Sequence, residues 1–327
     1  MQRCIDIAKN GLSAAMPNPS VGAVIVVNDC IIAEGFTSAF GGAHAEVNAI
    51  NAVADKSLLS QATMYVSLEP CSHFGKTPPC CDLIAKHKIP NVVVGCLDPN
   101  PKVSGAGIQR MKEAGILVNV GVLEHESRES NKRFFTFFEK KRPFVILKWA
   151  QSFDGFLSPK QRIDAVPVWL SNQYSRQLVH KWRTEEMAIL IGAQTAIDDN
   201  PGLTARDYSG KNPTRLLIDK NNRVLKNAKI FDNAAETIVL NHEKIDFSGN
   251  VVQQILNLLY LNNLQSVIIE GGAKTLQSFI DANLWDEARI FQSQKQLCDG
   301  TKAPVFNGIL FETKTILNDK LLIYKNI

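Results

Sequence analysis

The chain has 327 residues, of which 45% are hydrophobic and 21% are charged, and its formal net charge is +4. This length favours two domains, and the composition is that of an ordinary soluble globular protein. The weak positive charge does not favour a nucleic-acid surface, but it suits small anionic substrates such as phosphates. Apolar runs such as 21–27 are far shorter than the roughly 18 residues that span a bilayer, so we expect no membrane segment.

The N-terminus and the cysteines both favour a cytoplasmic protein. Charges occur in the first six residues, where a signal peptide would place its apolar core. The seven cysteines are an odd number, and six of them precede residue 100. This is a poor disulfide framework and a good supply of metal ligands, so we expect a reducing compartment.

The first part of the chain alternates between helical and strand patterns. Apolar residues recur at helical spacing from Ile5 to Ala15, and β-branched runs flank Asn28-Asp29, which is a hairpin signal. The order that we predict after this helix is strands at 21–27 and 30–35, a helix at 43–54, a strand at 63–68, a helix at 80–87, a strand at 91–96, a helix at 105–114, a strand at 116–120 and a connecting helix at 123–141. This alternation predicts a layered α/β domain with a largely parallel sheet.

A charged run ending in Pro143 separates this pattern from a second one. We place the domain boundary there, with one domain at 1–141 and another at 142–327. The second part is again predicted to be α/β, with strands at 144–150, 187–191, 215–218, 237–240, 266–269, 288–292 and 321–324, and helices at 172–182, 251–261 and 275–282.

A histidine and two cysteines have the spacing of a zinc site. His44-Ala45-Glu46 begins a predicted helix, and the Pro-Cys pairs at Cys71 and Cys80 flank a loop that leads into another. A catalytic zinc takes three protein ligands and keeps a fourth position for water. Glu46 is placed near the metal without having to bind it, which suits a proton shuttle. A structural zinc would need a fourth protein ligand, for which Cys81 and His73 are available.

These motifs resemble the cytidine-deaminase superfamily, in which H-x-E and P-C-x-x-C carry the chemistry. Here nine positions separate Cys71 from Cys80 instead of three. The loop from Glu69 to Cys80, with Asn18-Pro-Ser-Val-Gly22 and His44-Ala-Glu-Val-Asn48, closely resembles the bifunctional deaminase/reductase family of riboflavin biosynthesis. This resemblance covers essentially the whole chain. It implies an N-terminal cytidine-deaminase-like three-layer α/β/α domain and a C-terminal dihydrofolate-reductase-like α/β domain.

The resemblance also implies roles for residues of the first domain. His44, Cys71 and Cys80 are expected to bind one Zn²⁺, with Glu46 as the catalytic proton donor. Asn18, Asn48, His73 and Lys76 are expected to contact the pyrimidine or its ribose phosphate, while Asp98 and Asn100 are weaker possibilities.

Three segments of the second domain match the reductase half of the same family in order. They are 148–155, 192–206 and Ile269-Glu-Gly-Gly-Ala-Lys-Thr275. Paired glycines let the backbone approach a phosphate, and the helix that follows supplies N–H donors. By spacing alone, an ordinary strand-to-helix turn is equally compatible with this last segment.

The resemblance implies an NADPH site and a substrate site in this domain. The residues expected to bind NADPH are Ala150, Trp169, Thr195, Asp199, Gly272, Ala273, Lys274, Thr275, Leu276, Gln277 and Ser278, and we add Lys220 or Arg223 for the 2′-phosphate. The resemblance implies substrate contacts from Arg183, Leu203, Arg206 and Glu270. Of these, the two arginines suit the substrate phosphate, because a guanidinium fork matches a phosphate group. Pro167 stands where the family often has a substrate-binding serine, so it is left out of the site.

The expected function is sequential deamination and reduction of one phosphoribosylated pyrimidine. Lys148, Asp199 and Glu270 are the side chains we expect to move protons during ring opening. We expect no nucleic-acid or membrane partner, and the resemblance implies a homo-oligomer, a dimer or larger. Two alternatives stay open at this point: a nucleoside or nucleic-acid deaminase with a regulatory second domain, and a zinc-stabilised binding module with four protein ligands.

Overall fold

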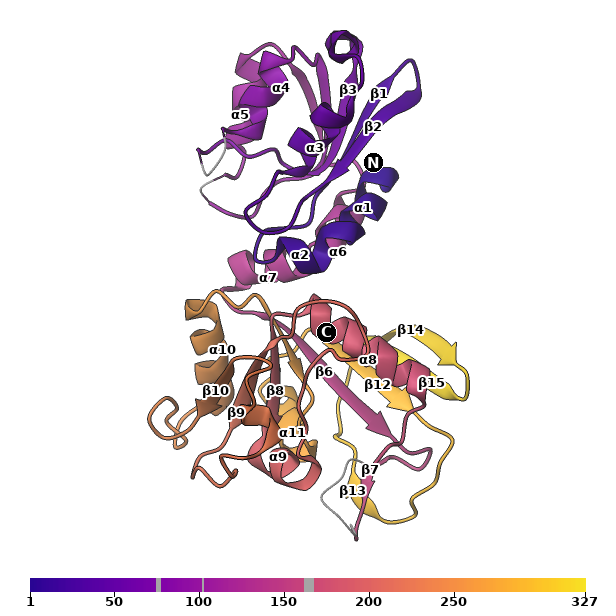
Figure 1. The fold of residues 1–327 in the computed structure, drawn as a ribbon, viewed down its shortest axis with the longest axis vertical. Coiled ribbons are helices and arrows are strands. Elements are labelled where there is room, and N and C mark those ends of the chain that lie inside the picture. Colours follow the sequence, from indigo (N-terminus) through magenta and orange to yellow (C-terminus); the bar gives the residue numbers. More distant parts are fainter. Residues whose placement is uncertain (75–77, 102, 162–167) are drawn as a thin grey trace. The chain divides into compact units, whose positions relative to one another are not determined.

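The computed structural model describes residues 1–74, 78–101, 103–161 and 168–327 of the chain. The chain divides into two compact units, Met1–Lys141 and Arg142–Ile327 (Figure 1). Lys76 and Pro167, both named above, lie outside the described residues. Within these residues no helix is both long enough and apolar enough to cross a membrane.

The first unit contains a five-stranded sheet in the order β2-β1-β3-β4-β5. Its strands are β1 (Gly22–Val27), β2 (Cys30–Phe36), β3 (Thr63–Leu68), β4 (Asn91–Cys96) and β5 (Leu117–Val120). Strands β3, β4 and β5 are parallel, whereas β1 is antiparallel to both β2 and β3. The prediction of a largely parallel sheet was therefore wrong for the pairing of β1 with β3, whereas the predicted hairpin of β1 and β2 is confirmed. Asn28 and Asp29 both have positive φ and form a two-residue turn, which only antiparallel strands can share.

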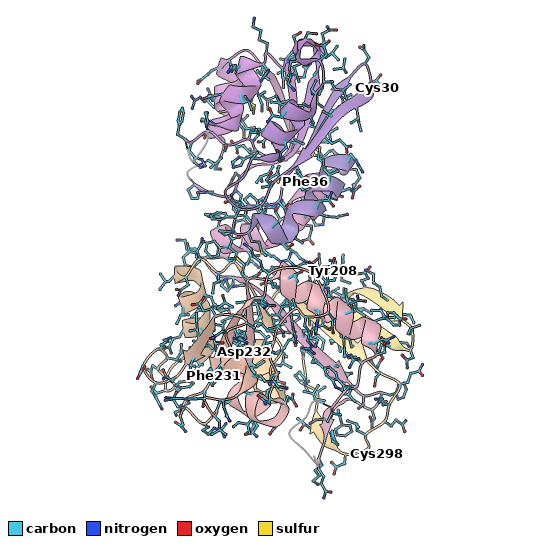
Figure 2. The ribbon with its side chains drawn as sticks, in the orientation of Figure 1. Cys30, Phe36, Tyr208, Phe231, Asp232 and Cys298 are labelled. Carbon is cyan, nitrogen blue, oxygen red and sulfur yellow. The ribbon has the colours of Figure 1, made fainter. Side chains whose placement is uncertain are left out.

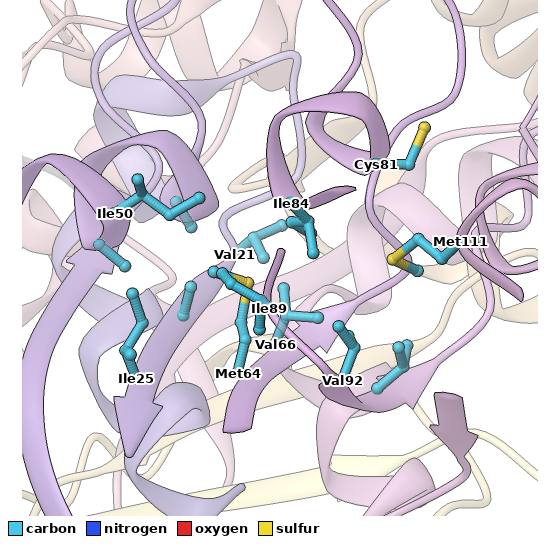
Figure 3. Close-up of a cluster of buried hydrophobic side chains, with 14 of the residues drawn as sticks. Val21, Ile25, Ile50, Met64, Val66, Cys81, Ile84, Ile89, Val92 and Met111 are labelled. Carbon is cyan, nitrogen blue, oxygen red and sulfur yellow. The ribbon is translucent and has the colours of Figure 1, made fainter. Parts of the chain in front are cut away.

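Helices cover both faces of this sheet. The helical segments are α1 (Gln2–Ala8), η1 (Lys9–Gly11), α2 (Leu12–Ala15), α3 (Ala45–Ala52), η2 (Lys56–Gln61), α4 (Cys80–Lys86), α5 (Ala106–Glu113), α6 (Glu124–Ser130) and α7 (Lys132–Lys140). The large core in Figure 3 packs Ile25, Met64 and Val66 of the strands against Ile50 of α3 and Ile84 of α4. On the other face, Cys4 and Ile7 of α1 pack against Val24. Alternate strand residues thus face two separate helical layers, which gives the expected three-layer domain.

The second unit contains an eight-stranded sheet in the order β10-β9-β8-β11-β6-β12-β15-β14. These strands are β6 (Phe144–Gln151), β8 (Ala188–Gly192), β9 (Thr214–Ile218), β10 (Thr237–Leu240), β11 (Ser266–Ile269), β12 (Glu287–Gln292), β14 (Ile309–Ile316) and β15 (Asp319–Lys325). The six from β10 to β12 are parallel, and β15 and β14 extend them in antiparallel fashion. A separate small ribbon pairs β7 (Phe156–Pro159) with β13 (Gly300–Lys302). Strands β7, β13 and β14 were not predicted, because their side chains show no buried alternation.

Four α-helices and a short 3₁₀ helix flank this sheet. They are α8 (Gln173–Glu185), α9 (Ala193–Asp199), η3 (Lys229–Phe231), α10 (Val251–Leu261) and α11 (Ala273–Asp281). On one face α8 packs Val179 and Trp182 against Ile146 and Ile268. On the other face Ile255 of α10 and Phe279 of α11 pack against Leu147 and Ile269. The central parallel strands β6, β8 and β11 are therefore buried on both sides, as parallel strands require.

Candidate functional site

Three predicted ligands converge in the first unit. His44 is the N-cap of α3, Cys80 is the first residue of α4, and Cys71 lies in the loop after β3. The Nδ1 atom of His44 is 3.6 Å from the sulfur of Cys71 and 3.4 Å from that of Cys80. All three ligand atoms lie within 4.8 Å of one another. Two helix starts and the loop after β3 therefore bring together one imidazole and two thiols from distant parts of the sequence.

The two cysteines share hydrogen bonds that favour a thiolate. The Cys80 thiol and then His44 lower the pKa of Cys71 to about 4, while the same pairing raises the pKa of Cys80. The backbone N–H of Cys80 also donates to the Cys71 sulfur at 3.3 Å. The hydrogen bond to Cys71 raises the pKa of His44 to about 8. Because thiolate and imidazole are the ligands that zinc prefers, this donor set fits Zn²⁺.

Glu46 lies beside these ligands on the first turn of α3, and it is 4% exposed. Burial raises the pKa of its carboxyl to about 7, with a further contribution from Cys71. A carboxyl with such a pKa can accept or give up a proton near neutral pH. Its position and its protonation behaviour are those of a proton shuttle.

The structure excludes Cys81 and His73 from this cluster. Of the described residues, only His44, Cys71 and Cys80 form a group that can hold a metal. Cys81 is buried in the core beside Ile84 (Figure 3), and its thiol is directed at Asp82. The geometry therefore brings three candidate protein ligands together, and no other described residue joins this group.

The other cysteines have no place in the site. Cys4 and Cys96 are buried in the core, whereas Cys30 and Cys298 are exposed, each on its own unit (Figure 2).

The predicted pyrimidine contacts in the described residues differ in their surroundings. Asn48 donates its amide to the carbonyl oxygen of Phe36 and to the hydroxyl of Ser38, so it holds the segment after β2. Asn18 is half-buried and His73 is exposed. Burial raises the pKa of Asp98 to about 6, and its carboxylate accepts a hydrogen bond from the backbone of Asn100.

Glu69 organises the loop that carries Asp98 and was missed by sequence reasoning. Its buried carboxylate accepts hydrogen bonds from the backbone N–H groups of Asp98, Gly105, Gly107 and Ile108, at 2.9 to 3.3 Å. It lies two residues before Cys71, so it ties the ligand loop to the start of α5. Only its position next to Pro70-Cys71 signalled such a role.

Three charged residues meet at the carboxyl ends of β6 and β11 in the second unit. Arg183 of α8 forms a two-pronged ion pair with Glu270, with distances of 3.1 and 2.8 Å. Lys148 lies 3.6 Å from the same carboxylate. Burial lowers the pKa of Lys148, and the two cations overcome burial to lower the pKa of Glu270 to about 2. Glu270 occupies the fork of Arg183, which we had expected to grip a phosphate.

The glycine turn between β11 and α11 packs against the turn after β8. The backbone N–H of Gly272 donates to the hydroxyl of Thr195 at 2.9 Å, so two predicted NADPH residues lie together. A methyl group on Gly271 would lie 2.9 Å from the Cβ atom of Thr275, and one on Gly192 would lie 2.8 Å from the hydroxyl oxygen of Thr275. The absence of side chains at these glycines therefore allows the close approach of the two segments.

The remaining predicted NADPH residues have varied environments. Leu276 is fully buried and Gln277 bonds the backbone of Val305, so neither side chain is available to a ligand in this arrangement. Trp169 is 45% exposed, with the guanidinium of Arg176 4.5 Å from its ring. Lys220 is exposed beside Phe247, and Lys274 is exposed as well. The others are Ala150, Asp199, Ala273, Thr275 and Ser278. The first four are half-buried, whereas Ser278 is exposed and its hydroxyl donates to the carbonyl oxygen of Thr275.

The two remaining substrate candidates lie on the loop after α9. Leu203 has a buried side chain and a positive φ of 52°, so only its backbone can meet a ligand. Arg206 is exposed and forms no ion pair with another described residue.

Comparison with known proteins identifies a family for each of the two units. Residues 1–96 match the cytidine and deoxycytidylate deaminase zinc-binding region, and residues 143–322 match the RibD C-terminal domain. The chain is 37% identical to the riboflavin biosynthesis protein RibD of Aquifex aeolicus, covering 92% of this chain and 87% of that protein. It is 40% identical to RibD of Chlamydia pneumoniae, covering 98% and 90%.

Solved structures give the same result. A deaminase/reductase from Thermotoga maritima superposes with a TM-score of 0.91 and 37% identity, covering 100% of this chain and 97% of that one. Acinetobacter baumannii RibD gives a TM-score of 0.87 at 30% identity, with the same coverage. These similarities confirm the fold expected for each half, and they leave no support for a second domain that is only regulatory. With a metal-ligand cluster in one half and a reductase-type sheet in the other, the chain belongs to the RibD family of riboflavin biosynthesis proteins.

Proposed function

We propose that this chain deaminates 2,5-diamino-6-ribosylamino-4(3H)-pyrimidinone 5′-phosphate and then reduces the ribosyl side chain of the product to ribityl with NADPH. The first unit, 1–141, is the zinc-dependent deaminase domain, and the second, 142–327, is the reductase domain. The observation that carries the proposal is the convergence of His44, Cys71 and Cys80 next to the buried Glu46.

In the deaminase, Glu46 performs the proton transfers. Zinc, when bound by the three ligands, lowers the pKa of a water molecule in its fourth position. A water molecule would add to the ring carbon that carries the amino group, while Glu46 accepts a proton from this water and delivers it to a ring nitrogen. Glu46 would then carry the proton of the added hydroxyl to the amino group, whose bond to the ring carbon breaks as ammonia leaves. Asn18, Asn48, His73 and Lys76 are proposed to hold the pyrimidine and its ribose phosphate.

In the reductase, the protein aligns the sugar and manages protons and charge. NADPH, when bound, supplies the hydride that reaches C1′ of the opened ribose. Its phosphates are proposed to meet the start of α11 at Gly272–Ser278, near Thr195. Arg183, Leu203, Arg206 and Glu270 are the proposed substrate contacts, with Arg206 as the exposed cation for the phosphate. Lys148 and Glu270 lie 3.6 Å apart and are proposed to donate and accept protons during ring opening. Asp199, the last residue of α9, is the third residue proposed for these proton transfers.

Two assays on the full chain test this function. The chain is incubated with the diaminopyrimidine phosphate, and ammonia release and NADPH oxidation are followed separately. Glu46→Gln is expected to keep zinc and to lose at least about a hundredfold in ammonia release, because the proton shuttle is removed. The control Glu113→Gln changes an exposed acid of the same unit and should behave as wild type. Normal ammonia release by Glu46→Gln would contradict the assignment.

We further propose that the chain forms a homo-oligomer through β14. In the described residues this strand is the edge of its sheet, and Ile309, Leu310 and Phe311 are 50 to 61% exposed. Antiparallel pairing of two copies about Thr313 would set Glu312 of each copy opposite Lys314 of the other, which favours a second copy as the partner. Leu310→Lys is expected to reduce the mass measured by analytical ultracentrifugation. An unchanged mass would exclude this edge.

The proposed setting is the cytoplasm. The two metal-binding thiols, Cys71 and Cys80, lie close enough to be sensitive to oxidation, and every cysteine of the structure is free. A reducing compartment preserves the thiolates that zinc needs.

A further inference from the structure

A buried histidine lies one helical turn from the charged cluster of the reductase. His180 of α8 is 3% exposed and precedes Arg183 by three residues, so both side chains lie on the same side of the helix. Its Nδ1 atom accepts a hydrogen bond from the backbone N–H of Asp207 at 2.9 Å. A ring nitrogen that accepts carries no proton, so His180 is the neutral tautomer with hydrogen on Nε2.

Helix α8 holds the Arg206 turn at two backbone points, one on each side of that residue. Arg183 donates from Nη1 to the carbonyl oxygen of Thr204 at 3.0 Å, and His180 accepts from Asp207. The turn is closed by the backbone N–H of Tyr208, which donates to the carbonyl oxygen of Ala205. The side chain of Arg206 between these anchors is exposed and unpaired with any described residue. The anchors thus fix the backbone while leaving the guanidinium available.

The charges around His180 keep it in the accepting form. Arg183 on its own helix, Arg206 and Asp207 on the turn, and Glu270 after β11 all face the ring. Its pKa is lowered to about 4, mainly by burial. The lowering effect of the two arginines exceeds the raising effect of Asp207 and Glu270. The ring is therefore neutral at neutral pH, and it adds no third positive charge beside the arginines.

We propose that His180 is a positioning residue of the reductase, which acts through the Asp207 N–H to hold Arg206 where it binds the phosphate of the deaminated substrate. This inference rests on the proposed function, in which Arg206 is the phosphate contact. The ligand class is a ribosylamino-pyrimidine monophosphate, and the residue controls its affinity and not the hydride transfer.

The test compares variants that keep or remove the acceptor. His180→Leu removes it, whereas the Oδ1 atom of His180→Asn takes the place of Nδ1. His180→Leu is expected to raise the KM for the deaminated substrate about tenfold, with little change in kcat or in the KM for NADPH, because one anchoring hydrogen bond is lost. His180→Asn is expected to restore the KM to within about threefold of wild type. Gln177→Leu, at an exposed position one turn earlier, is the matched control and should not change the KM.

A double-mutant cycle shows whether His180 acts through Arg206. When Arg206→Ala is already present, His180→Leu should cause little further increase in KM. A full tenfold increase in that background would overturn the inference, as would an unchanged KM in His180→Leu alone. If His180→Leu does not fold, His180→Gln provides the same test, because its amide reaches the Nε2 position and leaves Nδ1 empty. A decrease in kcat together with equal increases in both KM values, without rescue by asparagine, would indicate a merely structural residue and overturn the proposal.

The outcome is also distinguishable from failure of the proposed function. A wild-type chain that oxidises no NADPH with the deaminated substrate would overturn the proposed function and this inference together. A wild-type chain that oxidises NADPH, with no KM difference among the His180 variants, would overturn this inference alone.

Discussion

At the scale of single residues, buried charges in the second unit are stabilised by dense hydrogen bonding. Arg215 on β9 has no exposed surface, yet all its donor groups are used. Its guanidinium bonds the carboxylate of Asp232, the hydroxyl of Thr237 and the carbonyl oxygens of Gly202, Lys229, Asp232 and Ala235. One side chain thus anchors two segments: the loop at Gly202, just before Leu203, and the residues of and after η3.

Replacing Arg215 by Leu should destabilise the second unit. The change leaves several buried carbonyl oxygens without a donor, and we expect the free energy of unfolding to fall by about 3–5 kcal/mol. All four tryptophans lie in this unit, so tryptophan fluorescence during urea unfolding of the full chain reports on it alone. Arg3→Ala, which breaks the exposed pair with Glu34, is the control and should not shift the transition. Equal midpoints for Arg215→Leu and wild type would show that the network contributes little.

The stability of the second unit should also depend on pH through His180. The pKa of this histidine is about 4 in the folded chain and 6.5 as its ordinary value, so the unfolded state binds a proton first as the pH falls. Its contribution is fully present above about pH 6.5 and is lost as the pH falls toward about 4. The urea midpoint from tryptophan fluorescence should therefore drop between these values. His180→Asn, which does not titrate, should show a smaller drop; an identical drop would assign the pH dependence to other groups.

At the scale of elements, the metal ligands are positioned by the close packing of α3 on β2. A methyl group on Gly35 of β2 would lie 2.3 Å from the backbone nitrogen of Ala49 and 2.5 Å from the carbonyl oxygen of Ala45. Only a residue without a side chain allows the helix to lie this close to the strand. Because His44 caps α3 and Glu46 lies in its first turn, this contact fixes two components of the site at once.

Gly35→Ala should therefore weaken zinc binding. Helix α3 must move away from β2, which displaces His44 relative to Cys71 and Cys80, and we expect an affinity loss of about tenfold or more. Competition with a chromophoric chelator measures this affinity. Ile31→Ala, at an exposed position on the same strand, is the control. If Gly35→Ala binds zinc as tightly as wild type, the close contact does not determine the ligand geometry.

At the scale of the whole molecule, each unit has its own hydrophobic core and its own site. The three proposed zinc ligands all belong to Met1–Lys141, while the Lys148, Arg183 and Glu270 cluster belongs to Arg142–Ile327. The described residues of each cluster therefore come from one unit. This arrangement predicts that one activity can be lost while the other is kept.

Removal of the metal should separate the two activities. Dialysis against a chelator is expected to abolish ammonia release, because the three ligands then hold no zinc to activate water. NADPH oxidation with the deaminated substrate should continue at its former rate, since no zinc ligand belongs to the second unit. Both rates are measured on the same preparation, and readdition of zinc should restore deamination. A parallel loss of both activities would contradict the independence of the two units.

The sequence by itself determined the class of fold and the first site. Helices and strands with a buried stripe or face were predicted almost residue for residue, as at β3, β11 and α10, because burial imposes a period on the sequence. The candidate metal ligands could be proposed from the sequence because each is attached to a helix start or a Pro-Cys pair, features that are local in the chain. The same local signals separated the two halves.

Only the tertiary structure decided which residues of the second site meet. The exposed edge strand β14 was missed because it has no buried face, and the antiparallel pairing of β1 with β3 depends on partners far apart in sequence. The pairing of Arg183 with Glu270 joins residues 87 positions apart, and neither spacing nor composition could show that this carboxylate occupies the arginine fork. The same is true of His180, whose role depends on a backbone N–H 27 positions away. Contacts of this kind arise from packing, whose geometry the local sequence does not encode.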